Sequence, residues 1–367
     1  MLSVVEYRRA LHRIPELDDQ LTETCAYVRA RLEDFGLSPF SPIPGSVCAY
    51  LDAGKPSTTA FRADMDALPV EEPAGLPYAS THPGNMHACG HDGHTAMVLA
   101  LAEYAASRRE ALPQNILFLF QPSEETTGGA KRLCESGVLE RFHVSRIFGL
   151  HLWPNLEEGR IFSRPGPLMA RSNEITVTIT GKSVHLSRAE QGLDALTAGA
   201  DYLLRVYAAA EALPPSELRV LRFGKMASGT ARNIVSGKTV LSGSLRTYRE
   251  ETHRLCREVM ERTGREIASE TGCGVELHLS EGYPAVWNHE ALYAGVCTAL
   301  GDAAPRVLEK PVLAAEDFSF YQQKVPGVFF FLGIGTAPEL HAREFHFNDE
   351  AVLPEGVEFL KKLLLIK

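Results

Sequence analysis

The sequence predicts an α/β protein in which a small ferredoxin-like domain is inserted into a larger domain. Apolar runs of strand length alternate with helical patterns before Pro165 and again after Gly282, as in a sheet with helices on its faces. Between these points the elements follow the order β-α-β-β-α-β, which is the ferredoxin-like order. The expected domain boundaries are 1–168 and 283–367 for the two parts of the larger, catalytic domain and 169–282 for the inserted domain.

In the first segment, the spacing of apolar residues and the residues at the ends of each run predict the helices and strands. Leu21–Gly36 has apolar residues at helical spacing and ends at a glycine, a common C-terminal cap. Thr95–Ser107 is rich in Ala and Leu and is expected to be a helix. Asn115–Gln121 is a continuous apolar run between two prolines, typical of a strand that is covered on both faces. The other expected strands are Val47–Leu51, Thr59–Ala63 and Arg146–Leu150.

The inserted domain begins with Glu174–Thr180, in which apolar residues alternate with polar ones as in a half-buried strand. Its other expected elements are helices Leu193–Leu213 and Glu251–Glu270 and strands Leu218–Gly224, Thr239–Thr247 and Gly274–Ser280. In the third segment we expect a buried strand at Val328–Ile334, with helices at Glu290–Leu300 and Glu355–Leu365.

Composition excludes several classes of protein. The chain has 367 residues, of which 45% are hydrophobic, so it can bury a sizeable core and is not disordered. Its net charge of −9 argues against nucleic acid or an anionic membrane as the main partner. No apolar run is long enough to span a membrane, and because the N-terminal residues lack a continuous apolar stretch we expect no signal peptide. Seven scattered Cys are typical of reduced cytosolic thiols, so we expect a cytoplasmic protein.

The densest cluster of chemically active side chains is Met86–Thr95, which contains three His, one Cys and one Asp. Imidazole, thiolate and carboxylate are the groups that bind divalent transition metals. Cys89 and His91 are two residues apart, and Gly90 allows the backbone to fold closely around an ion that both could reach. The cluster predicts a metal site, whereas the alternative is a helix-start loop with incidental histidines.

Further Cys, His, Asp or Glu residues follow the ends of other expected strands. Glu124 and Glu125 follow the expected strand Asn115–Gln121, and His151 follows Arg146–Leu150. Asp64 follows Thr59–Ala63, and His341 lies beyond Val328–Ile334. Open α/β sheets bind ligands beyond the carboxyl ends of their strands. One acid of the pair could bind metal while the other acts as general base, although a lone Glu there could equally cap a helix. Because these residues all follow strands that end at the same edge of the expected sheet, a shared functional site is favoured over separate structural roles.

The inserted domain contributes His185, in the turn Gly181–Ser187 after its first strand and away from its core. Such a residue is either functional or a solvated loop histidine, and the sequence pattern alone leaves both open.

Seven segments, spread nearly from end to end, match one family in its own order. They are His12–Leu17, Arg62–Pro69, His87–Thr95, Gln121–Glu125, Gly229–Val235, Ala315–Tyr321 and Leu340–Glu350. On these motifs the chain resembles the amidohydrolase branch of the two-metal aminoacylase and carboxypeptidase family, which includes hippurate hydrolases, auxin-conjugate hydrolases and N-acetyl-amino-acid deacetylases. The resemblance implies a two-metal exopeptidase-like catalytic domain and an inserted ferredoxin-like domain that serves as lid and dimerises.

The resemblance also implies residue roles. The general base would be Glu124, and the ligands of two divalent ions would be Cys89, His91, Glu125, His151 and His341. His185 would reach a neighbouring active site and stabilise the oxyanion there. Asn233, with Arg246 as a weaker candidate, would lie near the carboxylate of the substrate.

The chain departs from its relatives at two of these places. Ser183 and Val184 precede His185 where relatives often carry two glycines. His346 stands where relatives are often acidic, whereas Leu340-His341 matches the family, so His341 is the expected ligand.

The expected activity is metal-dependent hydrolysis of the amide bond of N-acyl, chiefly N-acetyl, amino acids, with a water bridging the two metals as nucleophile. Zn, Mn, Co or Ni would suit the mixed S, N and O ligands. The expected partners are a small-molecule substrate and a second copy of the chain, bound through the inserted domain, with no nucleic acid or membrane. The alternatives are a dipeptidase or carboxypeptidase acting on small peptides and a catalytically inactive metal-binding homologue. The intact Glu124–Glu125 pair argues against an inactive homologue, because a binding protein needs no base.

Overall fold

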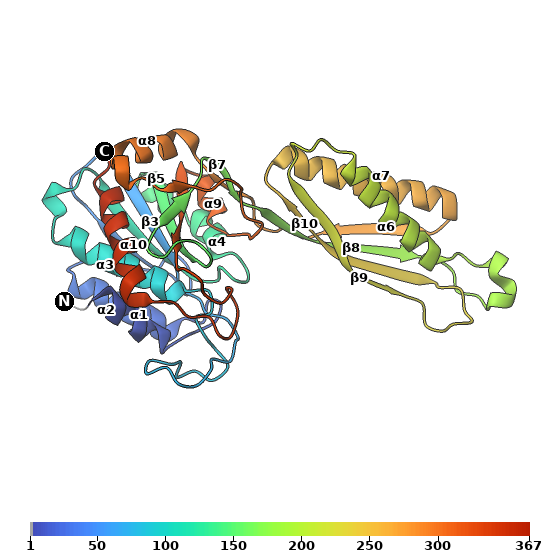
Figure 1. The fold of residues 1–367 in the computed structure, drawn as a ribbon, viewed down its shortest axis with the longest axis horizontal. Helices are drawn as coiled ribbons and strands as arrows, with labels where there is room; N and C mark the ends of the chain where they lie inside the picture. Colours follow the sequence, from blue (N-terminus) through green and yellow to red (C-terminus); the bar gives the residue numbers. More distant parts are fainter. Residues whose placement is uncertain (1–2) are drawn as a thin grey trace. The chain divides into compact units, whose positions relative to one another are not determined.

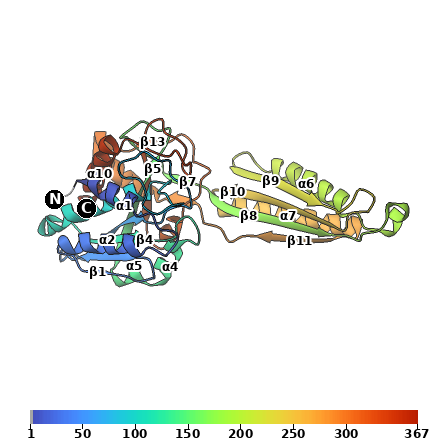
Figure 2. The same cartoon turned by 90° about the horizontal axis from the view of Figure 1, so that it is seen from below.

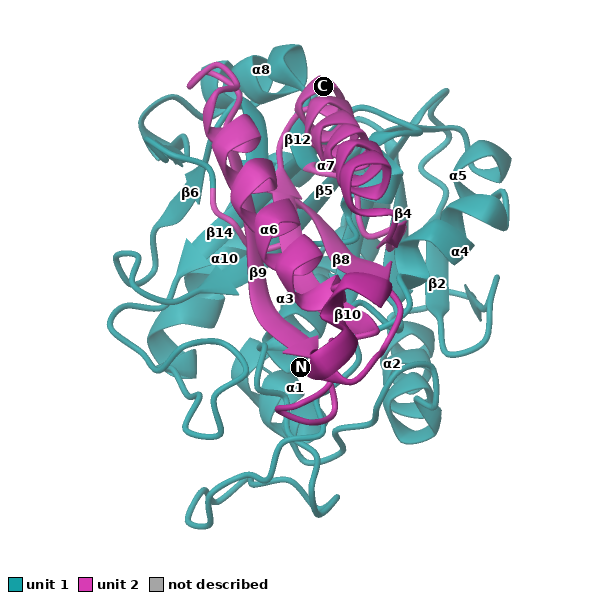
Figure 3. Cartoon of the chain, turned by 90° about the vertical axis from the view of Figure 1, so that its right-hand side faces the viewer, with its two compact units in different colours: residues 1–168, 286–311, 316–367 teal, residues 169–285, 312–315 magenta. Residues whose placement is uncertain are grey.

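The computed structural model describes residues 3–367, which form two compact units (Figure 3). Unit 1 contains the described residues up to Leu168 together with Val286–Pro311 and Glu316–Lys367, and unit 2 contains Met169–Ala285 and Val312–Ala315. Residues 283–285 and Val312–Ala315 therefore belong to unit 2, although the sequence boundaries assigned them to the catalytic domain. Backbone hydrogen bonds explain this, because Ala170 N–H donates to Ala314 C=O (2.9 Å) and Ser172 N–H to Tyr283 C=O (3.3 Å).

Unit 1 is built on a sheet whose described strands have the order β1-β2-β4-β3-β5-β14-β6-β13. Neighbours β4, β3, β5 and β14 run parallel, so their carboxyl ends lie at one edge of the sheet. All residues of β3, β4 and β14 are buried, which explains their continuous apolar sequences. The strands are β1 (Pro39–Phe40), β2 (Val47–Leu51), β3 (Thr58–Asp64), β4 (Asn115–Gln121), β5 (Val144–Trp153), β6 (Ile161–Ser163), β13 (Arg306–Val307) and β14 (Gly327–Gly333), with a separate ribbon of β7 (Gly166–Met169) and β12 (Val286–Asn288).

Helices cover both faces of this sheet (Figure 1). One face buries a single apolar core against α1 (Val4–His12), α2 (Thr22–Asp34), α3 (His91–Ala106), α8 (Glu290–Leu300) and α10 (Asp349–Leu364). The other face contacts α4 (Gly129–Glu135), α5 (Val138–Arg141) and α9 (Ser319–Gln322). Successive side chains of β14 point to opposite faces of the sheet. Phe330 belongs to the core on the first face, whereas Phe329 packs on Phe318, which precedes α9, with 4.9 Å between the ring centres.

Unit 2 has the order β8 (Arg171–Thr180), α6 (Ala195–Glu211), β9 (Arg219–Ser228), β10 (Lys238–Thr247), α7 (Glu250–Thr271) and β11 (Gly274–Leu279). A short 3-10 helix, η2 (Leu186–Gln191), precedes α6. The antiparallel sheet has the order β11-β8-β10-β9, and α6 and α7 cover one of its faces (Figures 1 and 2). The ferredoxin-like order and the α/β fold class that the sequence predicts are therefore confirmed.

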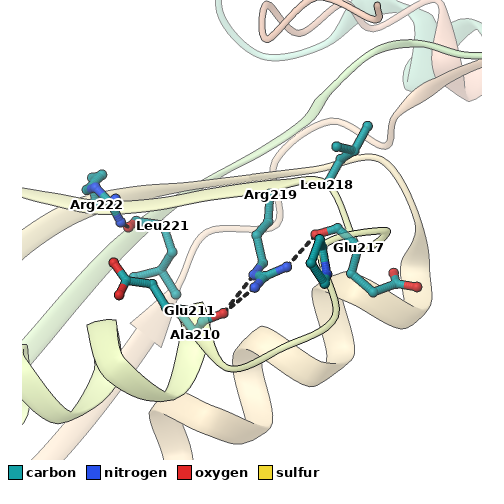
Figure 4. Close-up of a pocket in the computed structure, with 8 residues that line it drawn as sticks. Ala210, Glu211, Glu217, Leu218, Arg219, Leu221 and Arg222 are labelled. Atoms are coloured by element: carbon teal, nitrogen blue, oxygen red, sulfur yellow. Dashed lines mark hydrogen bonds between the residues drawn. The ribbon is translucent and has the colours of Figure 1, made fainter.

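Arg219 holds the start of β9 against the end of α6 (Figure 4). Its guanidinium donates hydrogen bonds to the C=O groups of Ala210 and Leu213, each at 2.9 Å, and Pro214, at 3.0 Å. These carbonyls lie in or just after the last turn of α6, where the helix offers them no partner. The charge also opposes the negative end of the helix dipole, so Arg219 fixes the connection between the two elements.

Several element boundaries differ from the sequence prediction. Helix α3 begins at His91 rather than Thr95, and β5 continues past Leu150 to Trp153. Helix α10 begins at Asp349 rather than at the expected Glu355, because the Asn348 side chain caps it by accepting from Ala351 N–H (3.4 Å). Helix α1 was not predicted, although Ser3 and Glu6 form a capping box at its start. Among residues 3–367, no helix combines the length and apolar character that crossing a membrane requires.

Candidate active site

The chemically active side chains gather at the carboxyl edge of the parallel strands of unit 1. Asp64 ends β3, Glu124 and Glu125 follow β4, and His151 lies near the end of β5. His341 follows β14, and its N–H donates to the C=O of Ala88 at 2.8 Å, which ties its loop to the Cys89 segment. The shared edge that the sequence predicted for these clusters is confirmed.

Cys89 and His91 are presented by the start of α3. Gly90 lies between them with φ of 85°, a left-handed conformation that glycine adopts without strain. A Cβ at Gly90 would lie 2.9 Å from Leu152 Cδ1, so the site also requires a residue without a side chain. The turn at Gly90 leads directly into the helix, which is why α3 starts earlier than its Gly- and His-rich first turn suggests.

The structure brings together the five side chains that the sequence predicts as metal ligands. Ligand atoms of Cys89, His91 and His151 lie within 4.8 Å of one another, and so do those of Cys89, Glu125 and His341. Cys89 Sγ is 3.5 Å from His151 Nε2, and Glu125 Oε1 is 3.2 Å from His341 Nε2. The two groups share Cys89, an arrangement suited to two neighbouring cations.

Hydrogen bonds orient two of the imidazoles toward this centre. His91 Nδ1 donates to Asp66 C=O (2.7 Å), and His151 Nδ1 donates to Leu152 C=O (2.6 Å). Each bond places a proton on Nδ1 and directs Nε2 toward the centre, the orientation in which a neutral imidazole binds a metal. His91 Nε2 is buried and has no hydrogen-bond partner among residues 3–367. A thiol, imidazoles and a carboxylate around such an orphaned nitrogen fit divalent transition metals.

His94 is close to this centre but has no lone pair to offer. Its Nε2 accepts from Leu152 N–H (2.9 Å), so its Nδ1 carries the proton that binds Asp64 Oδ1 (2.6 Å). Burial and the neighbouring His91 lower the pKa of His94, so the ring stays neutral. His94 therefore supports Asp64 and the end of β5.

Burial, reinforced by the carboxyls of Glu125 and Glu124, raises the pKa of Cys89 well above that of an ordinary thiol. A thiolate at this position consequently needs a cation beside it.

The two adjacent glutamates have different electrostatic environments. Burial, with Glu316 and Glu125 nearby, raises the pKa of Glu124 well above its ordinary value. Burial has the same tendency at Glu125, but the contact with His341 and the charge of His91 outweigh it and lower its pKa. Paired acids whose pKa values are driven apart are suited to different tasks. Here Glu125 is suited to bind a cation and Glu124 to carry a proton.

Asp66 holds this pair in place, a role that the sequence did not reveal. Its Oδ1 accepts from Glu124 N–H and its Oδ2 from Glu125 N–H, each at 3.0 Å. The same residue accepts from His91 through its backbone, so it orients one histidine and both glutamates.

A second buried charge cluster around Arg62 was also missed. The Arg62 side chain is 2% exposed, and its guanidinium contacts the carboxyls of Asp64 (2.7 Å), Glu316 (2.9 Å) and Asp317 (2.8 Å) and donates to Gln121 Oε1 (2.8 Å). The available signal was an arginine inside the apolar run of β3 and an acidic pair next to the aromatic segment around Phe318.

The remaining predicted site residues lie in unit 2. His185 is exposed, and its loop pairs with that of Asn233, since Leu186 N–H donates to Asn233 C=O (3.0 Å). Arg246 is half-buried on β10, where it hydrogen-bonds Ser172, and burial lowers its pKa. Asn233 precedes the first residue of β10 and Arg246 is near the last, so about 26 Å of strand separates them within one chain.

Comparisons with known proteins agree with this geometry. Residues 60–366 match peptidase family M20/M25/M40. An uncharacterized hydrolase of Staphylococcus epidermidis is 34% identical over 373 residues, which is 98% of this chain and 97% of the relative.

Solved structures are similar over the whole chain. The YXEP protein of Bacillus subtilis, a dinuclear metal binding peptidase from the M20 family, is 30% identical with a TM-score of 0.86 and covers 99% of this chain and 97% of its own. An aminobenzoyl-glutamate utilization protein from Klebsiella pneumoniae shares the fold, with 20% identity, a TM-score of 0.67 and coverage of 99% and 95%. The chain is a hydrolase and belongs to peptidase family M20/M25/M40.

Proposed function

We propose that this protein hydrolyses the amide bond of N-acyl amino acids, as a member of the amidohydrolase branch of its family. The observation that carries the proposal is the convergence of a buried thiol, three imidazoles and a carboxylate beside a second, protonatable carboxyl, Glu124. The Cys-Gly-His segment that presents Cys89 and His91 supports the choice of branch, since the chain resembles that branch there.

The proposed ligands are Cys89, His91, Glu125, His151 and His341, which would hold two divalent cations of Zn, Mn, Co or Ni. When bound, these cations would supply Lewis acidity that polarises the amide carbonyl and lowers the pKa of water.

Glu124 is the proposed general base. It would accept a proton from water as the oxygen–carbon bond forms, and later give that proton to the nitrogen as the carbon–nitrogen bond breaks. Its raised pKa suits a group that must hold a proton between the two steps. The bonds from the backbone of Glu124 and Glu125 to Asp66 keep base and ligand in fixed relation. General acid–base catalysis of this kind contributes about 10²–10⁴-fold to rate.

The unit 2 residues support a role in substrate binding by a pair of chains. Asn233 and Arg246 lie at opposite ends of β10, so both can contact one small carboxylate only if they come from different chains. Strand β9 is an edge of its sheet, and an edge strand can pair with a second copy. Leu204 (67% exposed) on the neighbouring α6 is apolar surface that a partner would cover. We therefore propose a homodimer formed through unit 2, in which His185 acts on the neighbouring subunit's substrate.

The seven cysteines are all free. Free thiols are typical of a reducing compartment, and this supports the proposal that the protein acts in the cytoplasm.

A dipeptidase is the second candidate, because the YXEP protein is a peptidase at 30% identity. N-acetyl, N-benzoyl and longer acyl amino acids should be compared with dipeptides as substrates of the metal-loaded protein, with and without a chelator. We expect the acyl amino acids to give the higher kcat/KM and the chelator to abolish turnover. Higher kcat/KM for dipeptides would contradict the proposed substrate class.

Replacing the proposed base separates catalysis from metal binding. Glu124→Gln should lower kcat by about 10²-fold or more, since the base contributes about 10²–10⁴-fold, while elemental analysis still finds two ions per chain. Glu140→Gln, at an exposed position, is the matched control and should change neither quantity. Wild-type kcat in Glu124→Gln would refute the assignment of the base.

A further inference from the structure

Glu316 is a buried carboxyl that has no part in the roles described so far. It belongs to unit 1, precedes α9 and is 2% exposed. Its Oε1 accepts from the Arg62 guanidinium and from Phe318 N–H, both at 2.9 Å. Both donors hold the same oxygen, so they fix the direction of the side chain without using Oε2.

This carboxyl lies beside the proposed base. One carboxylate oxygen each of Glu124, Glu316 and Asp317 lies within 4.8 Å of the other two. Asp317 is held in the protein interior, since its Oδ1 accepts from Arg62 (2.8 Å) and Gln121 (2.9 Å) and its Oδ2 from Gln121 (2.7 Å) and Ala130 N–H (2.9 Å). Four hydrogen bonds engage both oxygens of Asp317, which leaves Glu316 as the member of the pair suited to interact with Glu124.

Neighbouring buried carboxyls cannot all be charged without strong repulsion. Burial outweighs the charge of Arg62 and raises the pKa of Glu316 to about 8, so Glu316 carries a proton at neutral pH. One proton between two neighbouring carboxyls makes one of them a hydrogen-bond donor and the other a matching acceptor, so Glu316 and Glu124 can bind one another through a shared proton.

We propose that Glu316 is a positioning residue: oriented by Arg62 and by Phe318 N–H, its carboxyl holds the Glu124 carboxyl in the direction from which Glu124 exchanges protons with water and the leaving nitrogen. Glu316 acts only through Glu124, and the inference rests on the proposed function. The adjacent acids Glu316 and Asp317 thus have separate roles, one in orienting the base and the other in the buried network of Arg62.

Three substitutions of Glu316 test this. Gln keeps an oxygen for Arg62 and Phe318 N–H and has an amide that can donate to Glu124, whereas Leu has neither group. We expect Glu316→Leu to lower kcat by about 100-fold, the loss typical of a misplaced catalytic group, with KM and the metal content unchanged. Glu316→Gln should keep kcat within about threefold of wild type by the same argument. Glu309→Leu, at an exposed position nearby, is the matched control and should keep wild-type kcat.

If the Leu variant does not fold, Glu316→Asp replaces it, because a carboxyl one methylene shorter retreats from Glu124 and should lower kcat in the same way. The inference is overturned if the impaired variant keeps kcat, if the loss falls on KM or on metal content, or if Gln is as inactive as Leu. If the wild-type protein hydrolyses amides and the Glu316 variants are equally active, this inference alone is overturned. A wild-type protein that hydrolyses no amide overturns the proposed function as well.

Discussion

Arg62 provides the positive charge for a buried group of acids, and its removal should destabilise unit 1 strongly. Its guanidinium is 2.7 Å from Asp64, 2.9 Å from Glu316 and 2.8 Å from Asp317, and all four side chains are at most 2% exposed. Arg62→Met keeps the apolar stem and removes the charge, leaving these acids without their counterion. Because breaking a buried ion pair costs about 3–5 kcal/mol, the free energy of unfolding of unit 1 should fall by about 3 kcal/mol or more.

Urea denaturation followed by tryptophan fluorescence measures this loss in the correct unit. The chain has two Trp, Trp153 and Trp287, and both lie in unit 1. Arg62→Lys should show an intermediate loss, since one ammonium cannot reproduce the planar fork that serves several acids. Arg109→Met, at an exposed position of unit 1, is the control and should change stability by less than about 0.5 kcal/mol. The reasoning is refuted if Arg62→Met unfolds within about 1 kcal/mol of wild type, less than a third of the expected loss.

Two further predictions concern histidines of unit 1. His94→Gln should leave the metal content unchanged while Cys89→Ser lowers it, because both nitrogens of His94 are engaged in hydrogen bonds; elemental analysis that finds equal metal loss in both contradicts this. Burial lowers the pKa of His12, but its bonds to Asp92 and Glu72 outweigh burial, and the net pKa is raised. A histidine whose pKa is raised by folding stabilises the fold at pH values below its unfolded-state pKa, and this stabilisation disappears as the pH rises through its folded-state pKa. The difference in unfolding free energy between wild type and His12→Gln should therefore be larger at about pH 6 than at about pH 9. A stability difference that grows with pH argues against it.

Much of the fold was predictable because its elements carry local signals. The runs at Asn115–Gln121 and Glu290–Leu300 match β4 and α8 in full, since the first lies between prolines and the second has a regular helical pattern. The start of α3 was misjudged because residues such as His91 and Gly93 are poor helix formers in isolation. In the structure the first turn is stabilised by tertiary contacts, including Thr95 Oγ1, which donates to Asp64 C=O at 2.8 Å.

The candidate site was predictable where residue type alone implies chemistry. Cys89 and the Glu124–Glu125 pair stand out in the sequence, and the strand-end rule placed them together. The supporting residues could not be identified in this way, because their roles depend on partners distant in sequence. Arg62 and Asp317 are 255 residues apart yet 2.8 Å from one another, and the clamp of Asp66 on the backbone of Glu124 involves atoms that every residue possesses.

The most direct test of the central claim is an anomalous difference map from crystals grown with Mn or Zn. We expect two peaks per chain, close enough to share Cys89, with ligand distances of about 2.0–2.3 Å. The remaining protein ligands should be His91, Glu125, His151 and His341. A single peak, or peaks held instead by the pair His94 and Asp64, would contradict the account.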